Sequence, residues 1–443
     1  MNNYLLIYIS HYIYMSNKLS QEKLRLICIN LSDEIKKGDK FLNNKDVTIF
    51  NSSIIEINKS NNLLIASRGF YGDVRSWDGI NFIILSLFTN KLKKLKQNIL
   101  DIDPRVIQNQ SLKFKELKGK LIPHGETMLE GPEDPRLFYH KGGIFITINE
   151  LTKDKKRHMF ISKVDLGTLS YTDKMELCEP LSGDFEKNWG SFIYKKKLHM
   201  LYDINPLKVF ELDDDFKCKM KINVNDIILK KFSESYPDLH FHIRNSTNLI
   251  DVGKNKFLGL GHGVLDYKGN TDINKYLIPS IDKSKYKETD KDYFKEFYKL
   301  YTGFFYTLDM DKKEITEISP FFQLPNYESK QELIFFPTSM YLDNKKFVNI
   351  SYNVGDNRSY FMRLHLDVIN VSLYDKNNVD FQVNHNINAN YYLELIRSIR
   401  KMLGYPVERQ EYYKFGDVNR ILPMRKSKKT KKTKKSKKTK RMR

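Results

Sequence analysis

The chain has 443 residues, of which 40% are hydrophobic and 13% aromatic, and this composition excludes a fully disordered protein. Its formal charge of +21 is concentrated at one end, because residues 425–443 contain 13 Lys or Arg and no acid, leaving 62 bases against 54 acids elsewhere. Three scattered cysteines (Cys28, Cys178 and Cys218) are too few for a disulfide framework or a zinc site and favour a reducing compartment.

Residues 1–20 come first and are apolar up to Tyr14. They lack a basic start and a small-residue cleavage site, and the apolar run is too short to span a bilayer. We predict a weakly ordered extension on a cytoplasmic protein, with a signal anchor as the alternative. Met15 could be the true start.

Five hairpins follow. Each has two short apolar strands around a polar or Gly-containing turn, and the second strand ends on a polar residue. They are predicted over residues 54–68, 137–150, 191–203, 248–262 and 339–353. Short strands without long helices between them indicate antiparallel sheets. Their recurrence predicts an all-β, five-bladed β-propeller over residues 21–380, with a large β-sandwich as the alternative.

The run Gly-Pro-Glu-Asp-Pro-Arg at residues 131–136 precedes the second hairpin. Pro135 biases Asp134 away from helical backbone, and the preceding Gly-Pro pair makes a turn. A carboxylate held at the mouth of a strand, two residues from Arg136, could act as a catalytic acid. An ordinary Asp-Pro turn with a surface ion pair is the alternative.

The C-terminal part departs from the strand pattern. Residues 268–300 are a charged insert with a short amphipathic helix at 293–298, and helical spacing returns at 386–404. We expect residues 381–424 to be a helical appendage on the outside of the domain; a helix that touches a membrane is the alternative. Residues 425–443 should be a disordered tail that binds nucleic acid, an anionic membrane or nothing.

Polar residues at equivalent blade ends converge near the axis of a propeller, although they are far apart in sequence. Cations around an acid suit an anionic co-substrate such as phosphate or a sugar nucleotide, and an indole suits a sugar ring. The expected set is Arg68, Asp134, Arg136, Asp203, His262 and Asp356, with Lys187-Asn188-Trp189 and Arg244-Asn245-Ser246.

Several of these residues also have a purely structural interpretation. Trp189 could belong to the core, and Asp356 could serve an Asx turn. His240 and His242 share one face of a strand but lack a third ligand, so we predict no metal. Glycines on both sides of His262 would let a ligand approach its backbone. No Gly-rich phosphate loop or dinucleotide fingerprint occurs, so we predict no cofactor.

The Glu-Asp-Pro-Arg segment at residues 133–136 resembles the signature of glycoside hydrolase family 130. This family comprises five-bladed propeller β-mannoside phosphorylases and their relatives, and related mannosyltransferases share the fold. The resemblance covers roughly residues 50–365. Further segments follow in the family's order: Lys187-Asn188-Trp189, Gly261-His262-Gly263, and residues 304–309, 335–339 and 351–356.

The resemblance implies an inverting displacement in which Asp134 is the general acid. Phosphate is already an anionic nucleophile, so no second carboxylate is needed to activate water. We assign phosphate or substrate binding to Arg68, Arg136, Lys187, Arg244 and His262, and sugar binding to Asp203, Trp189 and Asp356. Residues 188–189 and 244–248 differ from the family's usual small residues, which leaves transfer from a nucleotide-activated mannose open.

We therefore predict an enzyme that acts on β-mannosidic linkages by phosphorolysis or mannosyl transfer, with hydrolysis less favoured. Phosphate or a nucleotide sugar would be the co-substrate. The first alternative is a non-catalytic propeller that binds glycans or a protein partner and is tethered by its basic tail. The second is nucleic-acid binding through residues 425–443.

Overall fold

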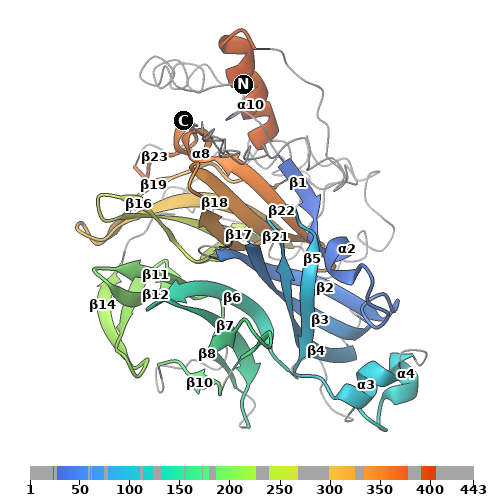
Figure 1. The fold of residues 1–443 in the computed structure, drawn as a ribbon. Helices are drawn as coiled ribbons and strands as arrows, with labels where there is room; N and C mark the ends of the chain where they lie inside the picture. Colours follow the sequence, from blue (N-terminus) through green and yellow to red (C-terminus); the bar gives the residue numbers. More distant parts are fainter. Residues whose placement is uncertain are drawn as a thin grey trace, which may run out of the picture.

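The computed structural model describes residues 23, 27–57, 60, 62–73, 78–109, 113–122, 131–153, 156–171, 173–178, 186–225, 239–267, 299–324, 334–377 and 391–405. Strands dominate these ranges, and the helices are few and short (Figure 1). The all-β prediction is therefore confirmed. Residues 425–443 and most of the 268–300 insert lie outside the described residues, so the tail and the helix at 293–298 stay predictions.

The described strands form four sheets, and the largest, of eight strands, joins two antiparallel groups through one parallel pair. We refer to these two groups and the other three sheets as units 1 to 5, and each contains one predicted hairpin. Unit 1 consists of β2 (Val47–Ile57), β3 (Asn62–Asp73), β4 (Asp78–Phe88) and β5 (Lys94–Leu100). Unit 2 consists of β6 (Glu133–His140), β7 (Gly143–Leu151), β8 (Arg157–Asp165), β9 (Ser170–Tyr171) and β10 (Met175–Glu176). Unit 3 consists of β11 (Gly190–Tyr194), β12 (Lys197–Ile204), β13 (Leu207–Leu212) and β14 (Cys218–Val224).

The last two units recruit strands from distant parts of the chain. Unit 4 consists of β15 (Leu239–Asn245), β16 (Ile250–Gly253), β17 (Lys256–Tyr267), β18 (Lys299–Asp309), β19 (Glu314–Ile318) and β23 (Tyr374–Asp375). Unit 5 consists of β20 (Phe335–Leu342), β21 (Phe347–Val354), β22 (Arg358–His365) and β1 (Ile27–Asn30). A single parallel pair, Ile49 with Arg358, joins units 1 and 5.

The first strands of neighbouring units contact one another. Hydrogen bonds run from Tyr139 Oη to the Glu56 carbonyl (2.9 Å), from Leu249 N to the Ser191 carbonyl (3.0 Å), from Asn248 Nδ2 to the Met340 carbonyl (2.8 Å), and from Ile54 N to Ser339 Oγ (2.8 Å). These bonds link unit 1 to unit 2, unit 3 to unit 4, unit 4 to unit 5, and unit 5 back to unit 1. Units 2 and 3 share an apolar cluster that includes Phe138 and Trp189.

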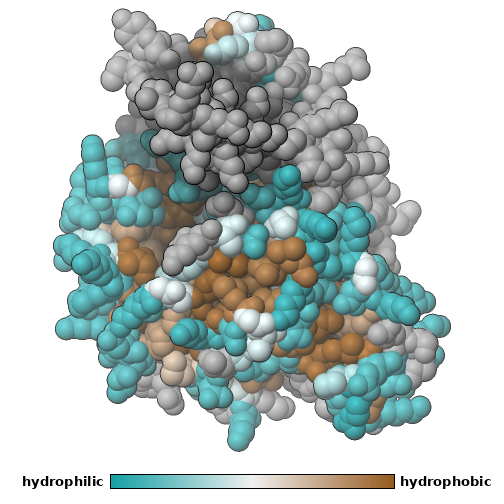
Figure 2. All heavy atoms as spheres, viewed as in Figure 1, coloured by the Kyte–Doolittle hydropathy of each residue, from teal (hydrophilic) through white to brown (hydrophobic). Residues whose placement is uncertain are grey.

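Apolar side chains from adjacent units interleave, because each strand buries its apolar positions against the next sheet. In the view of Figure 2, apolar side chains gather in the middle of the visible face, and hydrophilic ones cover most of its border. The short helices are α2 (Leu31–Lys36), α3 (Pro104–Gln108), α4 (Phe114–Leu117) and α8 (Leu366–Val371).

The C-terminal helix predicted from apolar spacing is α10 (Tyr391–Met402). Tyr392, Leu395 and Ile399 from this helix are buried in the cluster that also contains Phe305, so α10 packs against units 4 and 5. None of the helices in the described ranges combines the length and the apolar character that a membrane crossing needs.

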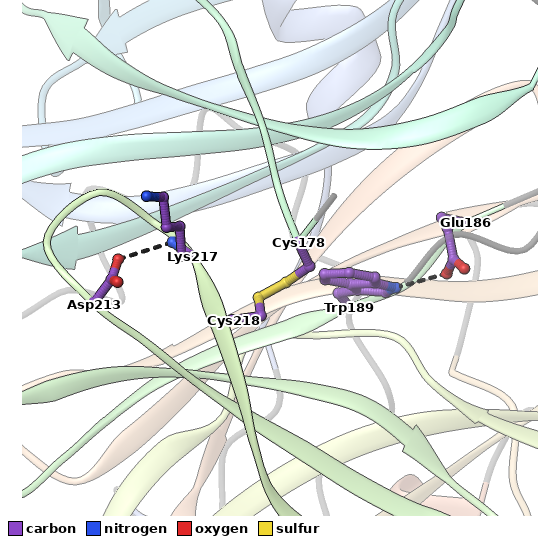
Figure 3. The surroundings of a disulfide bond; sticks show 6 residues. All are labelled: Cys178, Glu186, Trp189, Asp213, Lys217 and Cys218. Carbon is purple, nitrogen blue, oxygen red and sulfur yellow. Dashed lines mark hydrogen bonds between the residues drawn. A yellow bond between two sulfur atoms is a disulfide. The ribbon is translucent and has the colours of Figure 1, made fainter. Parts of the chain in front are cut away.

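Three scattered cysteines were expected to be too few for a disulfide framework, yet two of them pair. Cys178 and Cys218 form a disulfide, with Cα atoms 5.0 Å apart, between the end of unit 2 and the first residue of β14 (Figure 3). The 40 residues that separate them in sequence hid this proximity, because it depends on how units 2 and 3 meet. Cys28 is a buried free thiol.

Candidate active site

Two neighbouring strands are bulged at the same place, and each bulge turns a polar side chain inward. The register of β2 with β3 shifts between Phe50 and Ser53, and Asn51 there has a φ of 47°. The register of β6 with β7 shifts between Glu133 and Arg136, and Asp134 has a φ of 51°. Bulges re-aim side chains in this way beside binding sites.

Gly131 is required immediately before the second bulge. Its φ is 78°, and a Cβ at this position would lie 2.3 Å from the carbonyl oxygen of Asn81. The turn that the sequence predicts here is therefore packed against unit 1, and only glycine fits. This packing fixes where β6 enters the site.

Asp134 is buried, with 8% of its surface exposed. Its Oδ1 accepts a hydrogen bond from Asn51 Nδ2 at 2.6 Å and lies 3.3 Å from Arg68 Nη1. Burial acts to raise the pKa of Asp134, but Arg68, Arg136, Lys187 and the Asn51 hydrogen bond outweigh it and lower the pKa to about 2. Asp134 is therefore ionised at neutral pH in the empty site.

The carboxylate of Glu133, the residue before Asp134, lies close to three basic side chains. Glu133 Oε1 lies 2.9 Å from Arg68 Nη2 and 3.3 Å from Arg157 Nη2, and Oε2 lies 3.5 Å from Lys187 Nζ. Arg157 is fully buried. Site roles were not assigned to Glu133, Arg157 and Asn51 from the sequence. Of these three, only Glu133 belongs to a motif that was singled out there, the 133–136 segment.

Six of the predicted site residues line one pocket of about 450 Å³. They are Arg68, Asp134, Lys187, Arg244, His262 and Asp356. Phe50, Asn51, Glu133, Asn188, His242, Val264, Tyr301, Ile334 and Phe336 complete the lining. We call this cavity the first pocket. Four of the six lie on strands of units 1, 2 and 4, whereas Lys187 precedes β11 of unit 3 and Asp356 follows β21 of unit 5, so every unit contributes to the pocket.

Arg136 is 2% exposed and, unlike Asp134, does not line the first pocket. Its Nε donates to the Ser246 carbonyl at 3.0 Å and its Nη1 to the Pro135 carbonyl at 3.1 Å, whereas Nη2 finds no hydrogen-bond partner among the described residues. Burial lowers the pKa of Arg136 to about 10, against the opposing effect of Asp134. The group is still a cation at neutral pH, with one donor left over.

His262 is held by Ser246, whose Oγ lies 2.7 Å from His262 Nδ1. Burial, followed by the charges of Arg244 and Arg136, lowers the pKa of His262 to about 3, so the ring is neutral at pH 7. The flanking glycines do not serve a ligand as expected. A Cβ at Gly261 would lie 2.7 Å from the Phe304 ring, and one at Gly263 would lie 2.6 Å from the Phe241 ring.

Asp356 has the opposite protonation behaviour to Asp134. Burial raises the pKa of Asp356 to about 6, with Asp134 contributing and Arg68 opposing. Its Oδ1 accepts a hydrogen bond from Asn353 Nδ2 at 3.0 Å. The pocket thus holds two carboxyl groups with well-separated pKa values, an arrangement typical of sites that handle protons.

The balance of charge in and behind the first pocket is positive. Five basic side chains (Arg68, Arg136, Arg157, Lys187 and Arg244) meet three acids (Glu133, Asp134 and Asp356), a net of +2 when all are ionised. An anion bound there would restore neutrality, and guanidinium groups suit phosphate oxygens in particular.

Trp189 and Asp203 do not line the first pocket. The indole of Trp189 is 3% exposed, donates from Nε1 to Glu186 Oε2 at 3.1 Å and lies beside the Cys178–Cys218 disulfide (Figure 3). Trp189 is thus a core residue, as the structural interpretation held. Asp203 Oδ1 accepts hydrogen bonds from the backbone N–H groups of Ile204 (2.7 Å) and Asn205 (3.2 Å), so it shapes a turn.

No family model matches the chain, and the comparison with curated proteins found no match. Among solved structures, the chain is similar to mannoside phosphorylases and mannosyltransferases. A mannose phosphorylase from Leishmania mexicana, solved with phosphate ion, is 11% identical with a TM-score of 0.42, and the match covers 87% of this chain and 98% of that one.

Two further structures are similar at the same level. A GDP-Man-dependent mannosyltransferase from Leishmania mexicana is 12% identical with a TM-score of 0.41, covering 86% of this chain and 99% of that one. A β-1,2-mannobiose phosphorylase from Listeria innocua, in complex with β-1,2-mannobiose, is 10% identical with a TM-score of 0.41, covering 73% and 92%.

Proposed function

We propose that the chain is an enzyme that makes or breaks β-mannosidic linkages, by inverting phosphorolysis or by mannosyl transfer. The observation that carries the proposal is the buried Asp134 carboxylate among five basic side chains, three that line the first pocket and two, Arg136 and Arg157, that are buried behind its lining. A carboxyl group beside an anion-binding site is what phosphorolysis requires, because phosphate supplies its own nucleophilic charge. We infer that the sugar is mannose from the resemblance of residues 133–136 to the family signature.

We also propose that the five units are the blades of a closed propeller. Two observations support this. Hydrogen bonds or a shared apolar cluster connect each unit to the next, from unit 1 round to unit 5 and back. In addition, a second cavity is lined by residues from β2, β6, β11, β16 and β20, one strand from every unit.

In the phosphorolysis reaction, a phosphate oxygen bonds to the anomeric carbon as the glycosidic C–O bond breaks. The Asp134 proton goes to the departing glycosidic oxygen, which becomes the hydroxyl of the shortened acceptor, and the configuration at the anomeric carbon inverts. In the synthetic direction the Asp134 carboxylate accepts the proton of the acceptor hydroxyl. Lys187 and Arg244 are the groups that we assign to the phosphate, and the buried Arg136 adds positive charge behind them.

The low pKa of Asp134 is compatible with an acid that is loaded only when the anion is bound. Three cations hold the carboxylate ionised in the empty pocket. A phosphate that lies against the same cations reduces their effect on Asp134, so burial then dominates and the pKa rises. Asp134 would take up its catalytic proton as the complex forms.

Mannosyl transfer from a nucleotide-activated donor is the second candidate. The observation that favours it is the ionised Asp134, since a carboxylate is the form that accepts a proton from an acceptor hydroxyl. The surplus of cations would then bind the diphosphate of the donor instead of free phosphate.

The test is to incubate the full chain with β-mannooligosaccharides, with and without phosphate, and with mannose 1-phosphate or GDP-mannose plus an acceptor. Phosphate-dependent release of mannose 1-phosphate supports phosphorolysis, and extension of the acceptor from GDP-mannose supports transfer. Absence of a mannosyl product in every combination would contradict the proposal.

A further inference from the structure

The second cavity has a volume of about 360 Å³ and lies further along β2, β6 and β20, the three strands that line both cavities. On β2, Asn51 lines the first pocket and Glu56 lines the second; on β6 the corresponding residues are Asp134 and Tyr139. Five strand residues span about 16 Å, so the two cavities are separate sites. We call this cavity the second pocket. Its volume is within the range of small-molecule sites.

One wall of the second pocket carries a buried hydroxyl without a partner. Ser191, on β11, is 4% exposed, and its Oγ forms no hydrogen bond among the described residues. An unsatisfied hydroxyl in a protein interior is unfavourable, and most such groups are paired by protein, water or ligand. A hydroxyl group of a ligand in the pocket could both donate to and accept from Ser191 Oγ.

The charge of the second pocket distinguishes it from the first. Its lining includes two acids, Glu56 and Asp251, and no Lys, Arg or His. Phosphate, nucleotides and acidic peptides are therefore poor ligands, since no cation would compensate their charge. The Asn248 amide is already used, because it donates to the Met340 carbonyl and accepts from the Met340 N–H. The Ser191 hydroxyl and the Glu56 carboxylate are two of the polar groups that line this cavity.

The rest of the lining is mainly apolar, with both aliphatic and aromatic side chains. Phe138 and Tyr139 from β6, Phe192 from β11 and Tyr341 from β20 all line the pocket. Ring faces of this kind pack against apolar C–H surfaces, while the neighbouring carboxylates and amides bond to hydroxyl groups. A ligand that has both kinds of surface and no negative charge is a neutral sugar.

We propose that the second pocket binds a neutral carbohydrate of mono- or disaccharide size, independently of the first pocket. The inference does not depend on the proposed function, because none of the residues that carry it lies in the first pocket. The second pocket would bind its sugar whether the first pocket uses phosphate or a nucleotide sugar, and also if the chain had no enzymatic activity.

The test is isothermal titration calorimetry of the full chain with β-1,4-mannobiose and, separately, with cellobiose, both in phosphate-free buffer. The Asp134→Asn variant is used so that no sugar is consumed. Ser191→Ala combined with Glu56→Gln is expected to weaken sugar binding at least tenfold and to leave phosphate binding unchanged. The matched control is Ser162→Ala, another buried serine, on β8 and outside both pockets.

A second variant guards against misfolding of the first. Ile193 at the second pocket is 39% exposed, so Ile193→Arg should fold and should block the entrance. A crystal of the unmodified chain soaked in either sugar should show the ligand against Ser191. The proposal is overturned if both sugars bind only in the first pocket, or if neither variant weakens sugar binding. It is also overturned if the second pocket binds a small dication such as putrescine at Glu56 and binds neither sugar.

Discussion

Anion binding to the first pocket should load a proton onto Asp134. The pKa of Asp134 is about 2 in the empty pocket, because Arg68, Arg136 and Lys187 outweigh the effect of burial. A dianion about 5 Å from the carboxylate, at an effective dielectric constant of about 20, contributes roughly 3.3 kcal/mol per charge. Two charges give about 6.6 kcal/mol, or about 5 pKa units. The pKa would rise to about 7, near the value that suits a general acid.

The measurement is calorimetry of sulfate binding at pH 6.5 in buffers with different heats of ionisation. Sulfate is used because it stays a dianion, whereas phosphate titrates in this range. The dependence of the measured heat on the buffer's heat of ionisation gives the number of protons taken up on sulfate binding. We expect Asp134→Asn to take up fewer protons than the unmodified chain, by more than about half a proton per bound sulfate. Asp356→Asn is the companion variant, since the pKa of Asp356 is about 6. Equal proton uptake in the unmodified chain and Asp134→Asn would refute the reasoning.

Three further predictions follow from buried groups near the site. Glu133→Gln should lower the free energy of unfolding in urea by about 3 kcal/mol because it leaves buried cations uncompensated, whereas Asp214→Asn, in the exposed ion pair with Lys141, should leave it nearly unchanged. Gly131→Ala should cost about 2 kcal/mol more than Gly142→Ala in the same assay, because the φ values are 78° and 76° but only the first Cβ meets backbone. The free energy of unfolding should fall as the pH drops from about 6.5 towards 3, since the unfolded state protonates His262 first; a weaker pH dependence in His262→Gln checks this.

The sequence was most informative where local backbone chemistry decides the structure. The five hairpins and the helix at residues 391–402 were predictable from apolar periodicity and turn residues. Arg68, Asp134 and His262 were predicted to converge because each lies at one end of an apolar run in its hairpin, and they do line one pocket, although β3 and β17 continue beyond Arg68 and His262.

Contacts that depend on how units meet were not predictable. The Cys178–Cys218 disulfide and the burial of Trp189 both arise where units 2 and 3 pack together. The role of Asn51 depends on a bulge in β2, and no local pattern in Phe50-Asn51-Ser52 predicts that bulge. The glycines beside His262 were misinterpreted, because the rings that require them, Phe241 and Phe304, come from other strands.

The central claim is that Asp134 transfers the proton in the mannosyl reaction. The most direct test is the rate of Asp134→Asn with the substrate combination that is active in the unmodified chain, beside Asp203→Asn as a control that lies outside the first pocket. We predict that Asp134→Asn lowers kcat by about 10²- to 10⁴-fold, because the amide has nearly the same shape but cannot supply an acidic proton. Asp203→Asn should stay within a few-fold of the unmodified rate. A rate for Asp134→Asn equal to that of the unmodified chain would contradict the account.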